Sequence, residues 1–153
     1  MTNLTKPALK HLYKTDEYLW LEETISLLKA HSLEELDLEH LIEELESLGK
    51  RDLNKVRSLL RQIMVHLLLL EYWQEEQERN YRHWKGEVTA FRADLRDALT
   101  TSLENKLKED LESIYRTPLK IVLQKTGLSS NTIPDNCPYS FAQLFNDNWY
   151  PEY

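Results

Sequence analysis

The chain has 153 residues, of which 41% are hydrophobic and 29% are charged, and its formal net charge is −7. This length suffices for a packed core without disulfides or a metal ion, and the composition is that of an ordinary globular protein. The negative charge argues against a general nucleic-acid binder, because affinity for phosphates rests on Lys and Arg. The one cysteine, Cys137, excludes an internal disulfide and favours a cytoplasmic location.

The composition predicts a helical chain, since it combines three glycines with many leucines and charged residues and has few β-branched runs. Residues 1–14 lack the continuous apolar stretch of a secretory signal, and they are expected to form a partly ordered lead. Residues 15–153 are expected to form a single domain. The longest apolar run, residues 63–70, is far shorter than a membrane span, so no membrane partner is expected.

The first predicted helix begins with Thr15 as its cap, because two acidic residues follow in the opening turn. Its inward face would include Leu19, Trp20 and Leu27. Ser32 and Glu35 have the spacing of a capping box, which predicts the start of a short turn.

The main predicted helix carries apolar residues at helical spacing over more than thirty positions. Asp37 is placed to cap it, and Gly49 interrupts it without changing the apolar phase. We therefore favour a continuous or gently bent helix over about residues 38–74, with two helices joined at Gly49 as the alternative. The stripe consists of Leu38, Leu41, Leu45, Leu48, Val56, Leu59, Ile63, Leu67 and Leu70.

Further helices are predicted downstream, one with Trp84, Val88 and Leu95 on its apolar face and one over about residues 103–122. Pro118 must kink the latter or restart it with Thr117 as cap. Gly127 is a natural stop, and Ser140 with Gln143 would box a short final helix. The predicted fold is all-α: an antiparallel bundle of about four principal helices, with a short C-terminal helix and an aromatic tail.

The order of several short motifs resembles a bacterial family, largely cyanobacterial and proteobacterial, known only as domain of unknown function 29. The motifs are residues 41–49 (LIEELESLG), 66–68 (HLL) with Tyr72, Trp84 with Arg92, 126–128 (TGL), and Pro134 with residues 137–139 (CPY). The resemblance covers Tyr13 to Pro151 and implies an all-helical bundle without an assigned activity.

Polar residues on the apolar faces predict a possible site. Asp52 and His66 project onto the stripe of the main helix, Glu44 lies at its border, and Arg92 projects onto the apolar face of its own helix. A buried arginine needs an acidic partner, because desolvating its charge is costly. We therefore expect an interior cluster of Glu44, Asp52, His66 and Arg92, which either fixes helix register or lines a pocket for a small anionic or polar ligand.

Metal and nucleophile motifs are weak. No histidine follows a glutamate by three residues, as in di-iron bundles; Asp37 and His40 have that spacing, but a cap explains Asp37 more simply. Cys137 lies between Asn136 and Pro138 and reads as a structural thiol, because no basic neighbour in the sequence would activate it. We expect no metal, cofactor or catalytic residue, and whether the protein is an enzyme stays open.

The sequence favours a non-catalytic interaction or regulatory protein with a protein partner or a homo-oligomeric state. One alternative is a small-ligand or metal-binding bundle that uses the interior cluster, a site that would also allow an enzymatic activity. Another is a nucleic-acid or toxin–antitoxin type regulator that uses a basic helix face, although nucleic acid is not the expected partner. The candidate contact residues are Lys50, Arg51, Lys55, Arg57, Arg61, Trp84 and Trp149.

Overall fold

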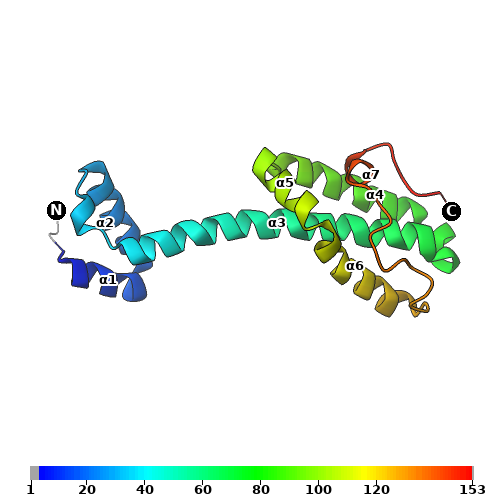
Figure 1. The fold of residues 1–153 in the computed structure, drawn as a ribbon, viewed down its shortest axis with the longest axis horizontal. Helices are drawn as coiled ribbons and strands as arrows, with labels where there is room; N and C mark the ends of the chain where they lie inside the picture. The colour runs from blue at the N-terminus through cyan, green and yellow to red at the C-terminus, as the bar shows by residue number, and fades with distance from the viewer. Residues whose placement is uncertain (1–3, 153) are drawn as a thin grey trace. The chain divides into compact units, whose positions relative to one another are not determined.

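The computed structural model describes residues 4–152, and within them it contains helices and turns but no strand (Figure 1). This confirms the prediction of an all-α fold. The elements are α1 (Lys6–Thr15), α2 (Glu17–Lys29), the 3₁₀ turn η1 (Leu33–Glu35), α3 (Leu38–Tyr72), α4 (Gln74–Ala98), α5 (Thr101–Glu109), α6 (Leu111–Thr126) and α7 (Phe141–Phe145).

The chain divides into two compact units, a first unit up to Arg51 and a second unit from Asp52 onward. The division falls within α3, so this helix contributes its first part to one unit and the remainder to the other. The single domain expected over residues 15–153 stays a prediction. Helix α1 lies mostly within the residues expected to form a partly ordered lead.

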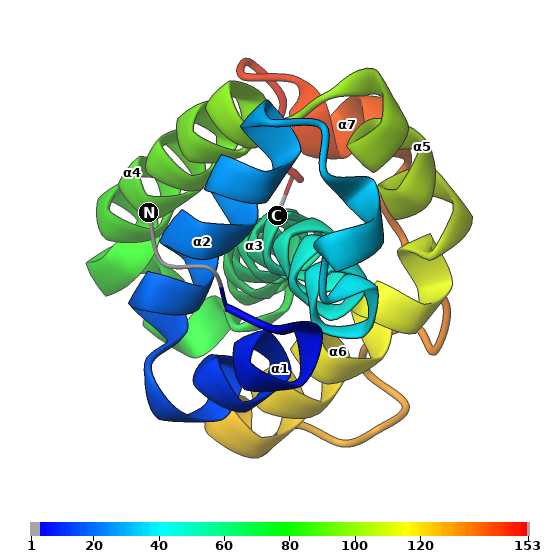
Figure 2. The same ribbon diagram turned by 90° about the vertical axis from the view of Figure 1, so that its left-hand side faces the viewer.

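In the first unit, short polar side chains fix where the helices begin. Thr5 caps α1 by accepting a hydrogen bond from the Ala8 amide. Asp16, rather than the expected Thr15, caps α2 by accepting from the Leu19 amide. Helices α1 and α2 pack against each other (Figure 2), with Leu9 and Trp20 buried. The turn predicted at Ser32 forms as η1, but its capping box does not, because the Ser32 side chain makes no capping bond.

Helix α3 is continuous through Gly49, as the unchanged apolar phase predicted. Its apolar stripe, however, is buried only in the second unit, from Val56 onward. Leu38, Leu45 and Leu48 are each about half-exposed. The stripe is therefore a core face in one unit and a surface in the other.

The core of the second unit forms where α4 turns back at Trp73 and runs antiparallel to α3 (Figure 1). The apolar face predicted for α4 is buried here together with residues 63–70 of α3. Helices α5 and α6 add Leu107, Tyr115 and Val122 to the same core. This unit has the packed helical arrangement that the sequence predicted.

The last segments follow their sequence signals closely. The helix expected over 103–122 breaks at Asp110 into α5 and α6, and α6 then continues through Pro118 instead of restarting there. Gly127 ends α6 with a left-handed φ of 69°. Ser140 and Gln143 form the predicted capping box of α7, and Leu144 of α7 is fully buried in the core.

Candidate functional site

The four residues predicted as one interior cluster have separate surroundings. Glu44 belongs to the first unit, where it accepts a hydrogen bond from the Tyr13 hydroxyl. Asp52 is exposed. His66 is half-buried; its Nδ1 lies 2.7 Å from the Gln62 carbonyl oxygen, and its ring lies 5.5 Å from that of Phe91. Burial lowers the pKa of His66 despite that carbonyl contact.

Arg92 is buried, as predicted, with only 2% of its surface exposed. Its Nε donates to the Leu144 carbonyl at 2.8 Å, and one terminal nitrogen donates to the Gln143 carbonyl at 3.0 Å. Its guanidinium also lies 5.1 Å from the centre of the Tyr150 ring. Burial lowers the pKa of Arg92, but arginine side chains keep their charge in proteins.

The expected pairing of Arg92 with an acid on the main helix requires correction. Its hydrogen bonds go to two carbonyl oxygens of α7, those of Leu144 and Gln143, and the Gln143 carbonyl also accepts from the Asn146 amide at 3.3 Å. The neighbouring Arg96 reaches the same segment through two bonds of 2.9 Å to the Asp147 carboxylate. These two arginines therefore hold the C-terminal segment against α4.

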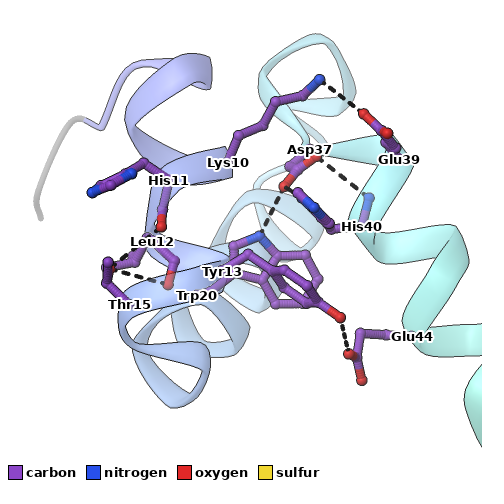
Figure 3. A network of polar contacts seen from close by, with 10 residues as sticks. All are labelled: Lys10, His11, Leu12, Tyr13, Thr15, Trp20, Asp37, Glu39, His40 and Glu44. Carbon is purple, nitrogen blue, oxygen red and sulfur yellow. Dashed lines mark hydrogen bonds and ion pairs between the residues drawn. The ribbon is translucent and has the colours of Figure 1, made fainter.

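A buried polar network that the sequence did not predict lies at the start of α3 (Figure 3). The carboxylate of Asp37 is fully buried, and one of its oxygens accepts from the Trp20 indole at 3.2 Å and lies 2.5 Å from His40 Nδ1. The other oxygen accepts from the His40 amide, which confirms Asp37 as the cap of this helix. Burial alone would raise the pKa of Asp37, but the bonds from His40 and Trp20 outweigh it and lower that pKa.

Tyr13 extends this network toward solvent. Its ring stacks on the His40 imidazole with centroids 4.0 Å apart, and it meets the Trp20 ring edge-on at 4.9 Å. The hydrogen bond to Glu44, followed by burial, raises the pKa of Tyr13 to about 12. A hydrogen bond with Glu44 also raises the pKa of Glu17. We call Tyr13, Trp20, Asp37, His40 and Glu44 the Asp37 network.

The Asp37 network joins three helices at one buried carboxylate. Asp37 can orient the His40 imidazole, as carboxylates do in many functional sites, but it also satisfies a helix start and a buried indole. The bonds to the His40 amide and the Trp20 indole therefore stabilise the fold and require no ligand to explain them. One pattern in the sequence indicated this network, the three-residue spacing of Asp37 and His40, whereas no local pattern identified Tyr13 or Trp20 as partners.

The surface of the first unit is unusually apolar. Of the twelve large hydrophobic side chains exposed among the described residues, eleven lie in this unit, and the exception is Ile121. Two groups follow helical spacing. The first, which we call the α3 stripe, is Leu38, Ile42, Leu45 and Leu48; the second, which we call the α2 stripe, is Tyr18, Leu21, Ile25 and Leu28.

A hollow of about 400 Å³ opens elsewhere on the first unit. Its lining combines the leucines Leu4, Leu9 and Leu27 with the polar side chains of α1, α2 and η1. The hollow thus adds further apolar lining to the unit that carries both stripes.

The contact residues predicted from the sequence divide into exposed and buried positions. Lys50, Arg51 and Lys55 are exposed. Arg57 is half-buried in an ion pair of 2.6 Å with Asp110, and Arg61 is also half-buried. Two of the five basic residues are therefore partly drawn into the packing of the second unit.

The two aromatic residues of the predicted contact surface are also partly or wholly internal. The prediction of Trp84 as a contact residue is wrong, since only 5% of its surface is exposed and its ring stacks on that of Trp73. Trp149 is half-buried and meets the Tyr139 ring edge-on. The aromatic side chains of this unit mainly serve its core.

The thiol of Cys137 is half-buried, and its Sγ lies 3.4 Å from the Tyr139 carbonyl oxygen. Burial raises its pKa to about 11, so the reactive thiolate is scarce at neutral pH. Within residues 4–152, no three His, Cys, Asp or Glu side chains are grouped to hold a metal ion. No helix of the described chain is both long and apolar enough to cross a membrane.

Comparisons with known proteins bear on the family rather than on the activity. No curated protein and no solved structure gives a significant match to the chain. A family model described as "Domain of unknown function DUF29" matches residues 12–150, which span both units and include the Asp37 network and the α3 stripe. The chain therefore belongs to the DUF29 family.

Proposed function

We propose that the protein is a non-catalytic protein-interaction module and that the α3 stripe forms the centre of its contact surface. The observation that carries this proposal is the concentration of exposed hydrophobic side chains in the first unit. Clustered exposed apolar residues on a folded protein typically mark an interaction site, whereas scattered single ones do not.

The energetic argument supports a protein partner. Fully burying a leucine or isoleucine contributes about 1.5–3 kcal/mol, so each half-exposed side chain of the stripe has about 1 kcal/mol still to gain. Association must first offset about 4–15 kcal/mol of lost rigid-body freedom. A partner that covers both stripes recovers more of that penalty than a small ligand contacting one or two side chains.

The Asp37 network supports the same proposal by making the contact surface rigid. Asp37 ties the start of α3 to α2 through Trp20, and Glu44 ties the middle of the exposed part to α1 through Tyr13. A surface that is already ordered loses less conformational entropy on binding. We also propose a cytoplasmic location, which the lone, half-buried thiol of Cys137 supports.

Site-specific photocrosslinking in the host cells tests the proposed function. A photoreactive amino acid would replace Leu45 in the full chain or, as the control, Ile121, an exposed hydrophobic residue of the second unit. We expect covalent adducts of protein size at position 45 and none at position 121. Equal labelling at both positions, or no protein adduct at position 45, would contradict the proposal.

A further inference from the structure

We propose that the partner of the α3 stripe is a second copy of the same chain, with the two α3 helices packed antiparallel about Leu45. This inference rests on the proposed function, because it names the partner of that contact surface. It also commits to one geometry, a two-fold dimer in which each copy presents the same face to the other.

The distribution of exposed apolar residues points to a second copy. An apolar face is best covered by another apolar face, since each then removes the other from water. Within the described chain, the second unit offers only Ile121 as an exposed large hydrophobic residue, so it lacks a matching surface. The first unit of another copy presents two apolar stripes of the required kind.

The charges beside the α3 stripe determine the direction of pairing. The exposed acidic residues Glu39 and Glu46 come first along this part of the helix, and the exposed basic residues Lys50 and Arg51 follow, before Asp52 at the end. Two parallel copies would place acidic residues beside acidic ones. Two antiparallel copies place the acidic beginning of each helix beside the basic end of the other, which favours that orientation.

A register centred on Leu45 satisfies both the apolar and the charged positions. Ile42 lies three residues before Leu45 and Leu48 three after, so each faces the other across the two-fold axis. Glu39 lies six residues before Leu45 and Lys50 five residues after it, and at about 100° per residue both project to the same flank of α3. Each Glu39, which pairs with Lys10 at 3.2 Å within its own chain, therefore comes beside a Lys50 of the second copy. The dimer thus has an apolar centre flanked by two pairs of opposite charges.

The outer rim of this register is polar. Leu38 comes opposite Asp52, which is exposed. The rim of an interface commonly stays accessible to water, so this position is compatible with a carboxylate. It also explains why a polar residue interrupts the stripe where the contact ends.

Analytical ultracentrifugation of the full chain tests self-association. We expect the weight-average mass to rise with protein concentration to that of a dimer. Leu45→Glu places two carboxylates at the axis and should raise the dimer dissociation constant by about 100-fold. Ile121→Glu, which makes the same change at an exposed residue of the second unit, should leave the constant unchanged. A chain that stays monomeric, or a dimer that Leu45→Glu leaves intact, overturns the inference.

Cysteine crosslinking tests the direction of pairing, in a Cys137→Ser background that removes the native thiol. In the antiparallel register, two Leu45→Cys side chains meet at the axis and should form an intermolecular disulfide. Two Leu38→Cys side chains lie about 21 Å apart along the helix axis, which is beyond disulfide reach, and should not crosslink. Both leucines are about half-exposed, so accessibility does not separate them. Equal crosslinking at both positions would show parallel pairing and overturn the geometry.

The two proposals fail in different ways. If photocrosslinking at Leu45 captures a different protein while the chain stays monomeric in the centrifuge, the proposed function stands and the second copy is wrong. If position 45 captures nothing and the chain stays monomeric, both proposals are wrong. An adduct of twice the mass of the chain, identified as the same sequence on both sides, supports both.

Discussion

The two units use the leucines of one helix in opposite ways. In the second unit, residues 67–70 of α3 are all fully or almost fully buried in a hydrophobic core, beside which Gln77 and Arg92 are also buried. In the first unit, the same helix leaves Leu38, Leu45 and Leu48 half-exposed, and its best-buried contacts include a carboxylate and an indole. An unbroken leucine pattern therefore does not show whether a helix face is buried within the chain or exposed on its surface.

The largest expected difference between the units comes from truncating one leucine in each part of α3. Leu67→Ala removes a fully buried side chain of the second unit and should lower the free energy of unfolding by about 2–5 kcal/mol, because it leaves a cavity. Leu45→Ala changes a side chain that is 58% exposed and should change that free energy by less than about 0.5 kcal/mol. Urea denaturation followed by circular dichroism measures both.

That comparison is valid only at a concentration where the chain is monomeric, since dimerisation would add stability to the wild type alone. A loss of 2 kcal/mol or more for monomeric Leu45→Ala would mean that the first part of α3 is covered within the chain. The two units would then no longer differ in how far they bury the leucines of α3.

A buried arginine and an exposed arginine that hold the same segment give the next largest effect. Arg92→Leu removes the side-chain donor from the carbonyls of Gln143 and Leu144, of which Gln143 keeps its bond from the Asn146 amide, and it should destabilise the protein by about 2–3 kcal/mol. Arg96→Leu removes a solvent-exposed ion pair with Asp147 and should have a much smaller effect. Thermal unfolding of the two variants compares them directly.

Hydrogen exchange localises the effect of Arg92. The amides of α7 should exchange faster in Arg92→Leu, whereas the amides of α1 and α2 should keep their wild-type rates. Equal melting temperatures for the wild type and Arg92→Leu would show that the guanidinium contributes nothing to holding the C-terminal segment.

Most helix starts and stops could be predicted from the sequence, because the hydrogen bonds that fix them join residues close together in the chain. Gly127 ends a helix, Ser140 and Gln143 box another, and Asp37 caps the main helix, each through bonds within four residues. The effect of Pro118 was harder to predict, since its sequence context allowed either a kinked helix or a new helix starting there. The helix is interrupted instead at Asp110, and α6 continues through Pro118. Helix boundaries depend on competition between neighbouring caps, which a single motif does not resolve.

The site was less predictable because a helical projection assigns a residue to a face but not to a neighbour. Arg92 was correctly predicted to be buried, yet its acceptors are backbone carbonyls 51 and 52 residues away in the sequence, and a pattern of side chains does not reveal which carbonyls are free to accept. The Asp37 network depends on Tyr13 and Trp20, which look like ordinary core aromatics. The exposed leucines carry the same pattern as buried ones, so only the structure separates them.

A smaller effect concerns the acid sensitivity of the first unit. The native pKa of Asp37 is lowered, so the unfolded chain, with a carboxyl pKa near 3.9, takes up a proton first as the pH falls. The contribution of Asp37 is therefore complete above about pH 4 and is lost as the pH falls toward its native pKa. Asp37→Asn should cost about 1–2 kcal/mol at pH 7 and flatten the decline in stability below pH 4.

NMR can follow this titration in the first unit alone, because Trp20 is its single tryptophan. The indole N–H resonance of Trp20, which reports the bond to Asp37, should shift as the carboxylate is protonated below pH 4. A resonance that stays constant to pH 2 while the protein remains folded would show that Asp37 is not its acceptor.

The smallest expected effects come from two glycines that differ in backbone conformation. A Cβ at Gly49 would meet no atom within 4 Å, and the residue lies inside a continuous helix. Gly49→Ala should therefore stabilise the monomer by about 0.5–1 kcal/mol, because alanine loses less entropy in a helix. Gly127→Ala also meets no clash, but its φ of +69° is strained for any residue with a Cβ, and it should destabilise by about 1 kcal/mol.

The sign of the Gly49 change carries more information than its size. Since Gly49 faces open space, a stabilising alanine in the monomer agrees with an α3 whose exposed part is a single uninterrupted helix. A destabilising alanine, measured by chemical denaturation below the dimer dissociation constant, would mean that the chain bends at Gly49 and that the α3 stripe is not one straight face. Because antiparallel pairing about Leu45 brings Gly49 opposite Leu41 of the second copy, the added methyl group should also shift the dimer dissociation constant in the ultracentrifuge, whereas Gly127→Ala should not.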